Sequence, residues 1–152
     1  MNTYANVGGN PLTYIDPLGL DWIWHQSTGQ LQHVDNNGHV TNVGTGYAGH
    51  GAGVNNPAMQ NASNTGPIPQ GTYTIQPQRD NVTGTGVVLP GSKRLVPDAD
   101  NQMAGRAGFL MLGPHANDHQ DSSNGCPVLA RPQRNQVGQG VGQGDNQLRV
   151  VP

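Results

Sequence analysis

The residues best suited to chemistry surround the single cysteine, Cys126. A polar loop at 113–125 precedes it, contains His115 and His119, and lies between apolar segments. A thiol is a weak nucleophile until a neighbouring base or positive field favours the thiolate, and either histidine is close enough along the chain to act as that base. Gly125 allows a sharp turn, and backbone N–H groups near Gly125 and Cys126 could stabilise an oxyanion. The pattern indicates a nucleophilic cysteine.

The same loop has two other interpretations. A lone cysteine is most often a small buried hydrophobic residue, and loop histidines are usually solvated. A zinc hydrolase is the other alternative, because His115 and His119 have passable zinc spacing. The remaining ligands would come from Asp118, Asp121 and Cys126. Histidines four residues apart bind one metal together only on a helix, which the nearby Gly-Pro pair and Asn117 disfavour. We therefore expect neither a metal nor another cofactor.

Composition favours one small, β-rich domain. The 152 residues include 23 Gly and 12 Pro, and only 33% are hydrophobic and 11% charged. Glycine and proline are poor helix formers. Seven Lys and Arg against nine acidic residues leave no basic surface for nucleic acid, and no segment approaches the ~18 apolar residues of a membrane helix. One cysteine permits no internal disulfide. Without a signal-like N-terminus, an extracytoplasmic role would require another export route.

Short segments of alternating polarity predict the strands. We expect them at 21–25, 30–34, 39–43, 71–75, 87–89, 94–96, 109–112 and 148–151. The turn at 35–38 ends in Asn-Gly and predicts a hairpin. Residues 44–71 are rich in turn formers and predict a loop, whereas 131–137 predicts one short helix that ends at Gly138. Trp22 and Trp24 are expected in the core.

The first twenty residues place turn formers between single apolar residues, in the pattern Y-x-N…NP…Y-x-DP-x-GL. This pattern closely resembles the end of the core of Rhs/YD-repeat proteins, just before their variable C-terminal toxin domains. The resemblance implies self-cleavage after Leu20, within a motif formed by Asp16, Pro17, Leu18, Gly19 and Leu20. It divides the chain into residues 1–20, the end of an Rhs core, and residues 21–152, the toxin domain.

A second resemblance covers about two-thirds of the chain. Its motifs are G-Y-A-G at 46–49, N-N-P at 55–57, G-P-I-P-x-G-x-Y at 66–73, G-R-x-G-F at 105–109 and S-N-G-C at 123–126. In this order they resemble L,D-transpeptidase-derived effectors of type VI secretion. The resemblance implies a mainly β fold: an L,D-transpeptidase-like twisted β-sandwich or barrel with long loops and one or two short helices.

The same resemblance implies the substrate, the stem peptide of peptidoglycan. Cys126 would attack the carbonyl of the L-centre of meso-diaminopimelate and expel D-alanine, leaving a thioester for water or an amine. His115 would serve as its base. Candidate contacts to substrate are Ser123, Asn124, Arg106, Tyr47 and His119.

Several of these side chains have a competing structural interpretation. Arg106 would bind a stem-peptide carboxylate through a bidentate pair, or form a surface ion pair with Asp98 or Asp100. Tyr47 and the nearby His50 would line the cleft or lie in a mobile, solvated loop. Arg131 and Arg134 would be carboxylate anchors or helix surface.

One position departs from the family pattern. The buried strand of L,D-transpeptidases normally ends in His-Gly, with that histidine as the base, but here it ends in Leu112-Gly113. His115 could have taken the role, since an imidazole need only lie within hydrogen-bond reach of the thiol. Alternatively, Leu112 is a substitution that inactivates a toxic enzyme, or the domain is a natural inactive relative that binds peptidoglycan without cleaving it.

The two resemblances together predict partners and location. The partners are peptidoglycan stem peptides, the Rhs core with its secretion machinery, and a cognate immunity protein, with no nucleic acid and no membrane insertion. The route is contact-dependent secretion, and the site of action is the periplasm of a target bacterium.

Overall fold

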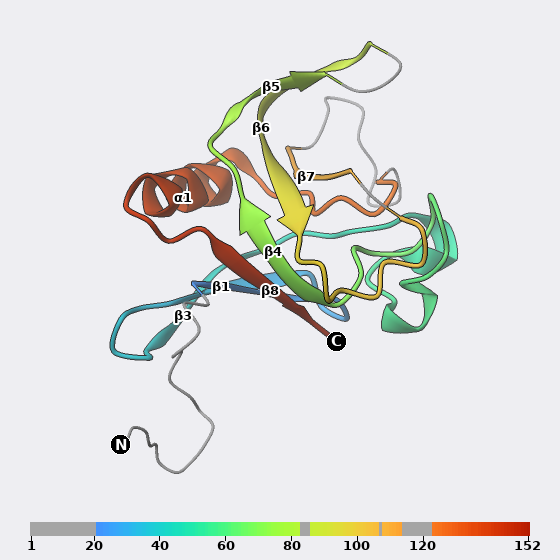
Figure 1. Ribbon diagram of the computed structural model, residues 1–152, viewed down its shortest axis with the longest axis horizontal. Helices are drawn as coiled ribbons and strands as arrows, with labels where there is room; N and C mark the ends of the chain where they lie inside the picture. Colours follow the sequence, from blue (N-terminus) through green and yellow to red (C-terminus); the bar gives the residue numbers. More distant parts are fainter. Residues whose placement is uncertain (1–20, 83–85, 107, 114–122) are drawn as a thin grey trace.

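The computed structural model describes residues 21–82, 86–106, 108–113 and 123–152, and eight strands among them form a mixed sheet (Figure 1). The strands are β1 (Trp22–His25), β2 (Gln30–Val34), β3 (Val40–Thr45), β4 (Gly71–Ile75), β5 (Arg79–Val82), β6 (Val88–Pro97), β7 (Phe109–Met111) and β8 (Gln147–Val151). Their order is β3-β2-β1-β8-β4-β6-β5, and β7 pairs with β6. The mainly β fold with few helices is thereby confirmed.

The last strand, β8, joins the two halves of the sheet. It pairs parallel to β1 and antiparallel to β4, and Figure 1 shows it running beneath β4 toward the C-terminus. Leu148 and Val150 are buried while Arg149 is exposed, as expected for alternating side chains on a half-buried strand. Chain ends far apart in sequence therefore share one core, which also contains Trp22 and Trp24, both at most 1% exposed.

The helix α1 (Arg131–Gly142) continues past the position where we expected it to end. Gly138 lies inside it, so the prediction of a stop there was wrong. Tertiary packing explains the difference: a Cβ on Gly140 would clash with the Trp22 ring, so the helix can approach β1 this closely only with glycine at that position. The Trp22 indole N–H also donates to the Asp145 carbonyl oxygen, at 2.7 Å, just beyond the helix.

Two expected strands are one. The segments 87–89 and 94–96 belong to the single strand β6, and its partner β5 was not expected from the sequence. Gly91 has φ of +65° and lies where the register between β5 and β6 shifts. This bend allows β6 to continue through a Pro-Gly pair that predicts a turn when it is considered alone.

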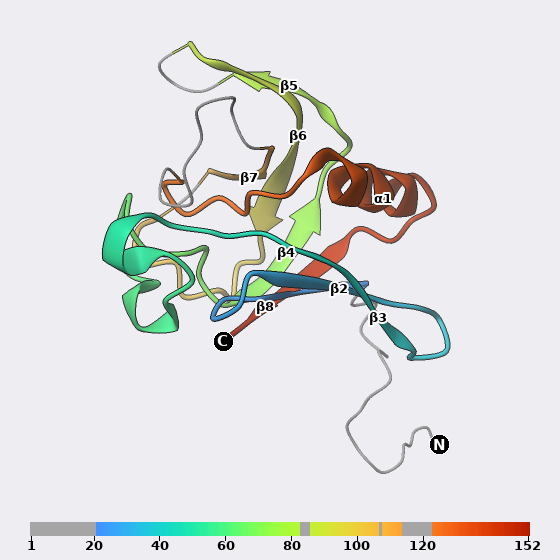
Figure 2. The ribbon, with the colours of Figure 1, turned by 180° about the vertical axis from the view of Figure 1, so that it is seen from behind.

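The segment expected to be a loop contains two short 3-10 helices, η1 (Gly51–Gly53) and η2 (Pro57–Met59). Figure 2 shows this segment at the end of the molecule opposite α1. Asn56 caps η2, its side-chain oxygen accepting from the Ala58 N–H at 3.1 Å. No helix in the described ranges is long and apolar enough to cross a membrane.

Lys93 is the one cation of the described chain with no exposed surface. Its Nζ donates to Gln78 Oε1 at 2.7 Å, and burial, with Arg134 nearby, lowers the pKa of Lys93 to about 8. The unfolded chain has a lysine pKa near 10.5, so between pH 8 and pH 10.5 it binds more protons than the folded chain. At pH 7, burial of the Lys93 charge therefore lowers the free energy of unfolding by about 3 kcal/mol.

We expect Lys93→Met to raise the free energy of unfolding at pH 7 by up to about 3 kcal/mol. Because wild type loses its penalty as pH rises from 8 toward 10.5, the difference between the two proteins should be less than half as large at about pH 9.5. Urea denaturation of both proteins at both pH values measures this difference. The contributions of other titrating groups cancel, because they are the same in the variant and in wild type. A difference that does not change with pH would contradict the assignment.

Candidate functional site

The turn before the cysteine is held by its own hydrogen bonds. Ser123 Oγ accepts from the Gly125 N–H at 3.0 Å and donates to the Cys126 carbonyl oxygen at 2.7 Å. Gly125 has φ of +117°, a conformation that L side chains rarely adopt, and a Cβ there would clash with Arg106 and Phe109. Glycine is thus required at this position.

These contacts change the roles expected for two residues. The Ser123 hydroxyl is buried and already acts as donor and acceptor within the turn, so it positions Cys126 and its O–H is not free for substrate. The Gly125 N–H is engaged by that hydroxyl, which leaves the Cys126 N–H as the candidate oxyanion donor of this turn. Asn124 is exposed and its side chain stays available.

Arg106 fastens the cysteine turn to the 3-10 segment. Its Nη1 donates to the carbonyl oxygens of Gln60 and Pro67, and its Nη2 donates to those of Gly66 and Asn124. The guanidinium also lies over the Phe109 ring, with Cζ 5.0 Å from its centroid. One buried cation thereby connects three segments of chain.

This geometry corrects both interpretations of Arg106. Four carbonyls accept from the four N–H groups of Nη1 and Nη2, so no pair of donors is free to bind a carboxylate bidentately. The side chain is 6% exposed, and in the described part of the chain the ion pairs are His33–Asp145 and His39–Asp35. Arg106 is therefore neither a surface ion-pair partner of Asp98 or Asp100 nor a free anchor for substrate.

Cys126 lies beside β7 and is partly buried as a residue. Its Sγ accepts from the Leu110 backbone N–H at 3.3 Å. Burial raises the pKa of the Cys126 thiol, while the Leu110 N–H and the Arg106 charge act in the opposite direction. Because the net direction is upward, the thiol needs a base to react as a thiolate near neutral pH.

Leu112, where the resemblance to L,D-transpeptidases predicts a histidine, lies directly beside the segment that follows the cysteine. Its N–H donates to the Pro127 carbonyl oxygen at 3.0 Å, and its carbonyl oxygen accepts from the Leu129 N–H at 2.9 Å. The parallel bridge pairs Leu112 with Val128, two residues beyond Cys126. These backbone contacts bring residue 112 next to the cysteine segment. The Leu112 residue is partly exposed.

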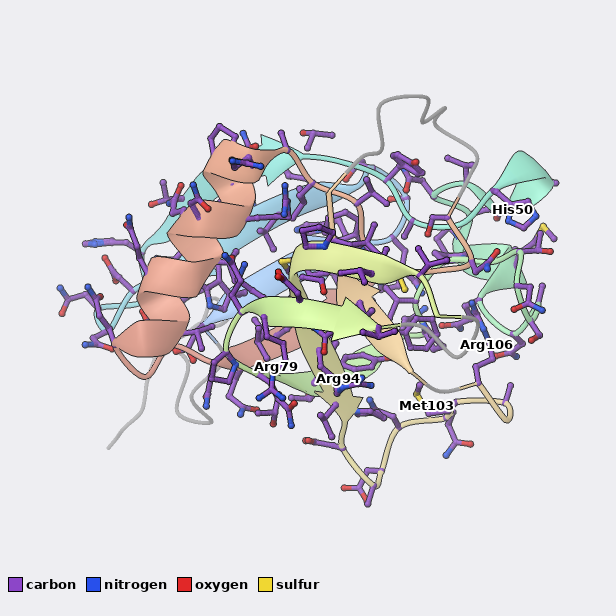
Figure 3. The ribbon with its side chains drawn as sticks, turned by 90° about the horizontal axis from the view of Figure 1, so that it is seen from above. His50, Arg79, Arg94, Met103 and Arg106 are labelled. Carbon is purple, nitrogen blue, oxygen red and sulfur yellow. The ribbon has the colours of Figure 1, made fainter. Side chains whose placement is uncertain are left out.

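The His50 imidazole reaches the cysteine turn from the Gly-rich loop. His50 precedes η1, and its Nδ1 lies 3.0 Å from the Ser123 carbonyl oxygen. A carbonyl can only accept, so Nδ1 carries the proton and Nε2 of the neutral ring holds the lone pair. Figure 3 shows His50 and Arg106 at the same end of the molecule. The sequence named His50 only as a possible cleft residue and offered no signal for this contact.

Tyr47 is buried, at 6% exposed, and its backbone forms a two-way bridge with Val128. The alternative of a mobile, solvated loop at Tyr47 was therefore wrong. Arg134 donates from Nε to the Leu129 carbonyl oxygen and from Nη1 to that of Gly91, at 3.0 and 3.3 Å, while Arg131 is exposed on α1.

Other predicted site residues lie outside the described residues. They are His115, His119, the zinc candidates Asp118 and Asp121, and the self-cleavage motif of Asp16, Pro17, Gly19 and Leu20. Within the described ranges, no group of three or more metal-ligating side chains occurs.

The fold and the site define a class: a mainly β domain that presents one cysteine on a constrained turn beside a buried strand. The family model described as the Tlde1 domain matches residues 42–151. The chain belongs to this family, whose members are L,D-transpeptidase-like effectors of type VI secretion. No curated protein and no solved structure matches the chain.

Proposed function

We propose that this domain is an antibacterial effector that acts on peptidoglycan stem peptides by cysteine acyl transfer. The observation that carries the proposal is the placement of Cys126: this partly buried residue follows a hydrogen-bonded turn, and its Sγ accepts from the Leu110 N–H at 3.3 Å. Membership of an L,D-transpeptidase-like effector family supports the same chemistry.

The reaction begins with transfer of the Cys126 proton to an imidazole. The thiolate attacks the carbonyl carbon of the L-centre of diaminopimelate, and the Cys126 N–H stabilises the oxyanion. When the tetrahedral intermediate collapses, the C–N bond breaks and D-alanine leaves with the proton from the imidazolium. Water then hydrolyses the thioester, which is L,D-carboxypeptidase activity. An amine in place of water gives L,D-transpeptidation or exchange of D-amino acids.

Two imidazoles are candidates for the base. His115 is the candidate from the sequence, because it lies three residues after the family position. His50 is the candidate from the geometry, because its Nδ1–H is held by the carbonyl of Ser123 in the cysteine turn, which puts the lone pair of the neutral ring on Nε2. Single alanine variants separate them: the base is the histidine whose loss lowers kcat without changing the melting temperature.

We expect Cys126→Ala to abolish the conversion of tetrapeptide to tripeptide stems in purified sacculi. Without sulfur there is no nucleophile and no thioester. The measurement is muropeptide chromatography after digestion with wild type and with the variant, and thermal melting establishes that both are folded. Unchanged muropeptides from wild type and from a Leu112→His variant would overturn the enzymatic proposal.

A second candidate is a peptidoglycan-binding domain without catalysis, favoured by one observation. Leu112 lies beside the cysteine segment at the position of the family histidine, and a leucine side chain cannot accept a proton. This candidate predicts that the domain is pulled down with sacculi while muropeptide profiles stay unchanged.

We further propose that the effector domain begins at Asp21 and follows an Rhs core cleaved after Leu20. Asp21 is tied to the closing strand in two ways: its N–H donates to the Gln147 carbonyl oxygen at 3.1 Å, and its Oδ2 accepts from the Gln147 N–H at 3.0 Å. Residues 21–41 thus belong to the sheet although the family match begins at 42. The remaining expected partners are the secretion machinery and an immunity protein, and the expected site of action is the periplasm of the target cell.

A further inference from the structure

A polar pocket that does not include Cys126 lies where β4, β8 and the segment after β6 meet. Its volume is about 470 Å³, within the usual range for small-molecule sites. Its lining includes two carboxylates, a guanidinium and several amides, among them Asp98, Asp100, Arg149, Asn101 and Gln60. Nothing in the proposed cysteine chemistry uses these side chains.

The register of the sheet places opposite charges on one face. Thr72 in β4 pairs with Arg149 in β8, whose Nη1 donates to Thr72 Oγ1 at 3.4 Å. On the other side of Thr72, the Asp98 N–H donates to the Thr72 carbonyl oxygen at 3.0 Å, directly after β6. Neighbouring strands are about 4.8 Å apart, so the backbones of Arg149 and Asp98 are separated by roughly 10 Å.

The floor of the pocket is preorganised. The Asn101 side chain bonds both backbone groups of Thr72: its Oδ1 accepts from the N–H at 3.1 Å and its Nδ2 donates to the carbonyl oxygen at 2.9 Å. A Cβ on Gly71 would clash with this amide. Another lining residue is held as well: Gln60 Oε1 accepts from the Gln70 N–H at 2.9 Å. A ligand would therefore meet side chains that are already oriented.

The charges that face the pocket are not paired with each other. The ion pairs of the described chain each join a histidine to an aspartate elsewhere, so Arg149, Asp98 and Asp100 are exposed without an ionic partner among the described residues. A ligand that carries one positive and one negative group would contact both ends of the pocket, and a ligand with a single charge would contact only one.

We propose that this pocket binds the zwitterionic group of an amino acid, an ammonium and a carboxylate on one carbon. Arg149 receives the carboxylate, Asp98 and Asp100 receive the ammonium, and the amides bind the remaining polar atoms. The proposal does not rest on the cysteine chemistry. The two sites are nevertheless joined, because the backbone carbonyl of Gln60 in the pocket wall accepts from Arg106 of the cysteine turn.

The test compares five small probes on the full chain by ¹⁵N chemical-shift titration, with glycine and meso-diaminopimelate as zwitterions and N-acetylglucosamine as the uncharged probe. N-acetylglycine retains only the carboxylate and glycinamide only the ammonium. We expect dissociation constants on the order of millimolar for the zwitterions, shifts at Thr72 and Asn101, and at least about ten-fold weaker binding of both single-charge probes, since each loses one charge-assisted contact.

Variants locate the binding. Arg149→Gln and the double variant Asp98→Asn/Asp100→Asn should each weaken glycine binding about ten-fold. Arg79→Gln is the matched control, because Arg79 is also exposed but lies on β5, outside the pocket. The proposal would be overturned if N-acetylglycine bound as tightly as glycine, or if the shifts occurred outside the pocket. It would also be overturned if Arg79→Gln weakened binding as much as the pocket variants, or if uncharged N-acetylglucosamine caused the same shifts. Because no probe is cleaved, these outcomes are independent of the thiol.

Discussion

Leu112→His is expected to raise the conversion of tetrapeptide to tripeptide stems by at least about ten-fold, since a positioned general base typically contributes 10²–10⁴-fold. The Leu112 backbone is hydrogen-bonded to Pro127 and Leu129, on either side of Val128. A histidine at position 112 would therefore lie beside Val128, which is two residues after Cys126. The raised pKa of the Cys126 thiol makes a base necessary. Initial rates of muropeptide conversion on purified sacculi measure the effect.

Two controls make this result specific. Leu112→Asn introduces a polar side chain of similar size that accepts no proton near neutral pH, and it should leave the rate at the level of wild type. Leu112→His combined with Cys126→Ala should be inactive. If Leu112→His is no faster than wild type while wild type itself converts stems, another imidazole already serves as the base, and the His50→Ala and His115→Ala variants then identify it.

Arg106→Gln is expected to lower the free energy of unfolding by about 3 to 5 kcal/mol, because it leaves several carbonyl oxygens without donors and removes a buried cation from its partners. Gly66 and Pro67 on one segment and Asn124 on the other lose the side chain that joins them. Urea denaturation at pH 7 measures this loss, and reactivity of the Cys126 thiol toward a maleimide should rise as the turn loosens.

Two further variants separate geometry from charge. Arg106→Lys keeps the charge but presents one ammonium in place of a planar fork, so it should recover less than half of the lost stability. Arg79→Gln removes an exposed arginine of β5 and should change stability by no more than about 0.5 kcal/mol. Figure 3 shows Arg79 well separated from Arg106. A loss below about 1 kcal/mol in Arg106→Gln would contradict the proposed clamp.

Local pattern was sufficient wherever side chains alternate on a half-buried strand. The expected strands at 30–34 and 71–75 have the bounds of β2 and β4, since period-two polarity determines which face is buried. It failed where long-range packing overrides a local signal. Gly138 is a helix breaker in isolation, yet α1 passes through it because glycine at position 140 fits against Trp22. The strand β5 is mostly polar, so its sequence does not predict a strand, and only its pairing with β6 in the structure identifies it.

For the site, residue types predicted a nucleophilic role for Cys126 and a sharp turn at Gly125, because a thiol after a buried strand and a tight turn are local features. The resemblance to L,D-transpeptidases, and not residue type alone, singled out position 112. Only the folded chain decided the partners of Arg106, the approach of His50 to the cysteine turn and the pocket around Arg149. Each of these joins segments 18 to 77 residues apart. Such contacts depend on strand order and register, which are properties of the whole sheet and leave no periodic trace in any one segment.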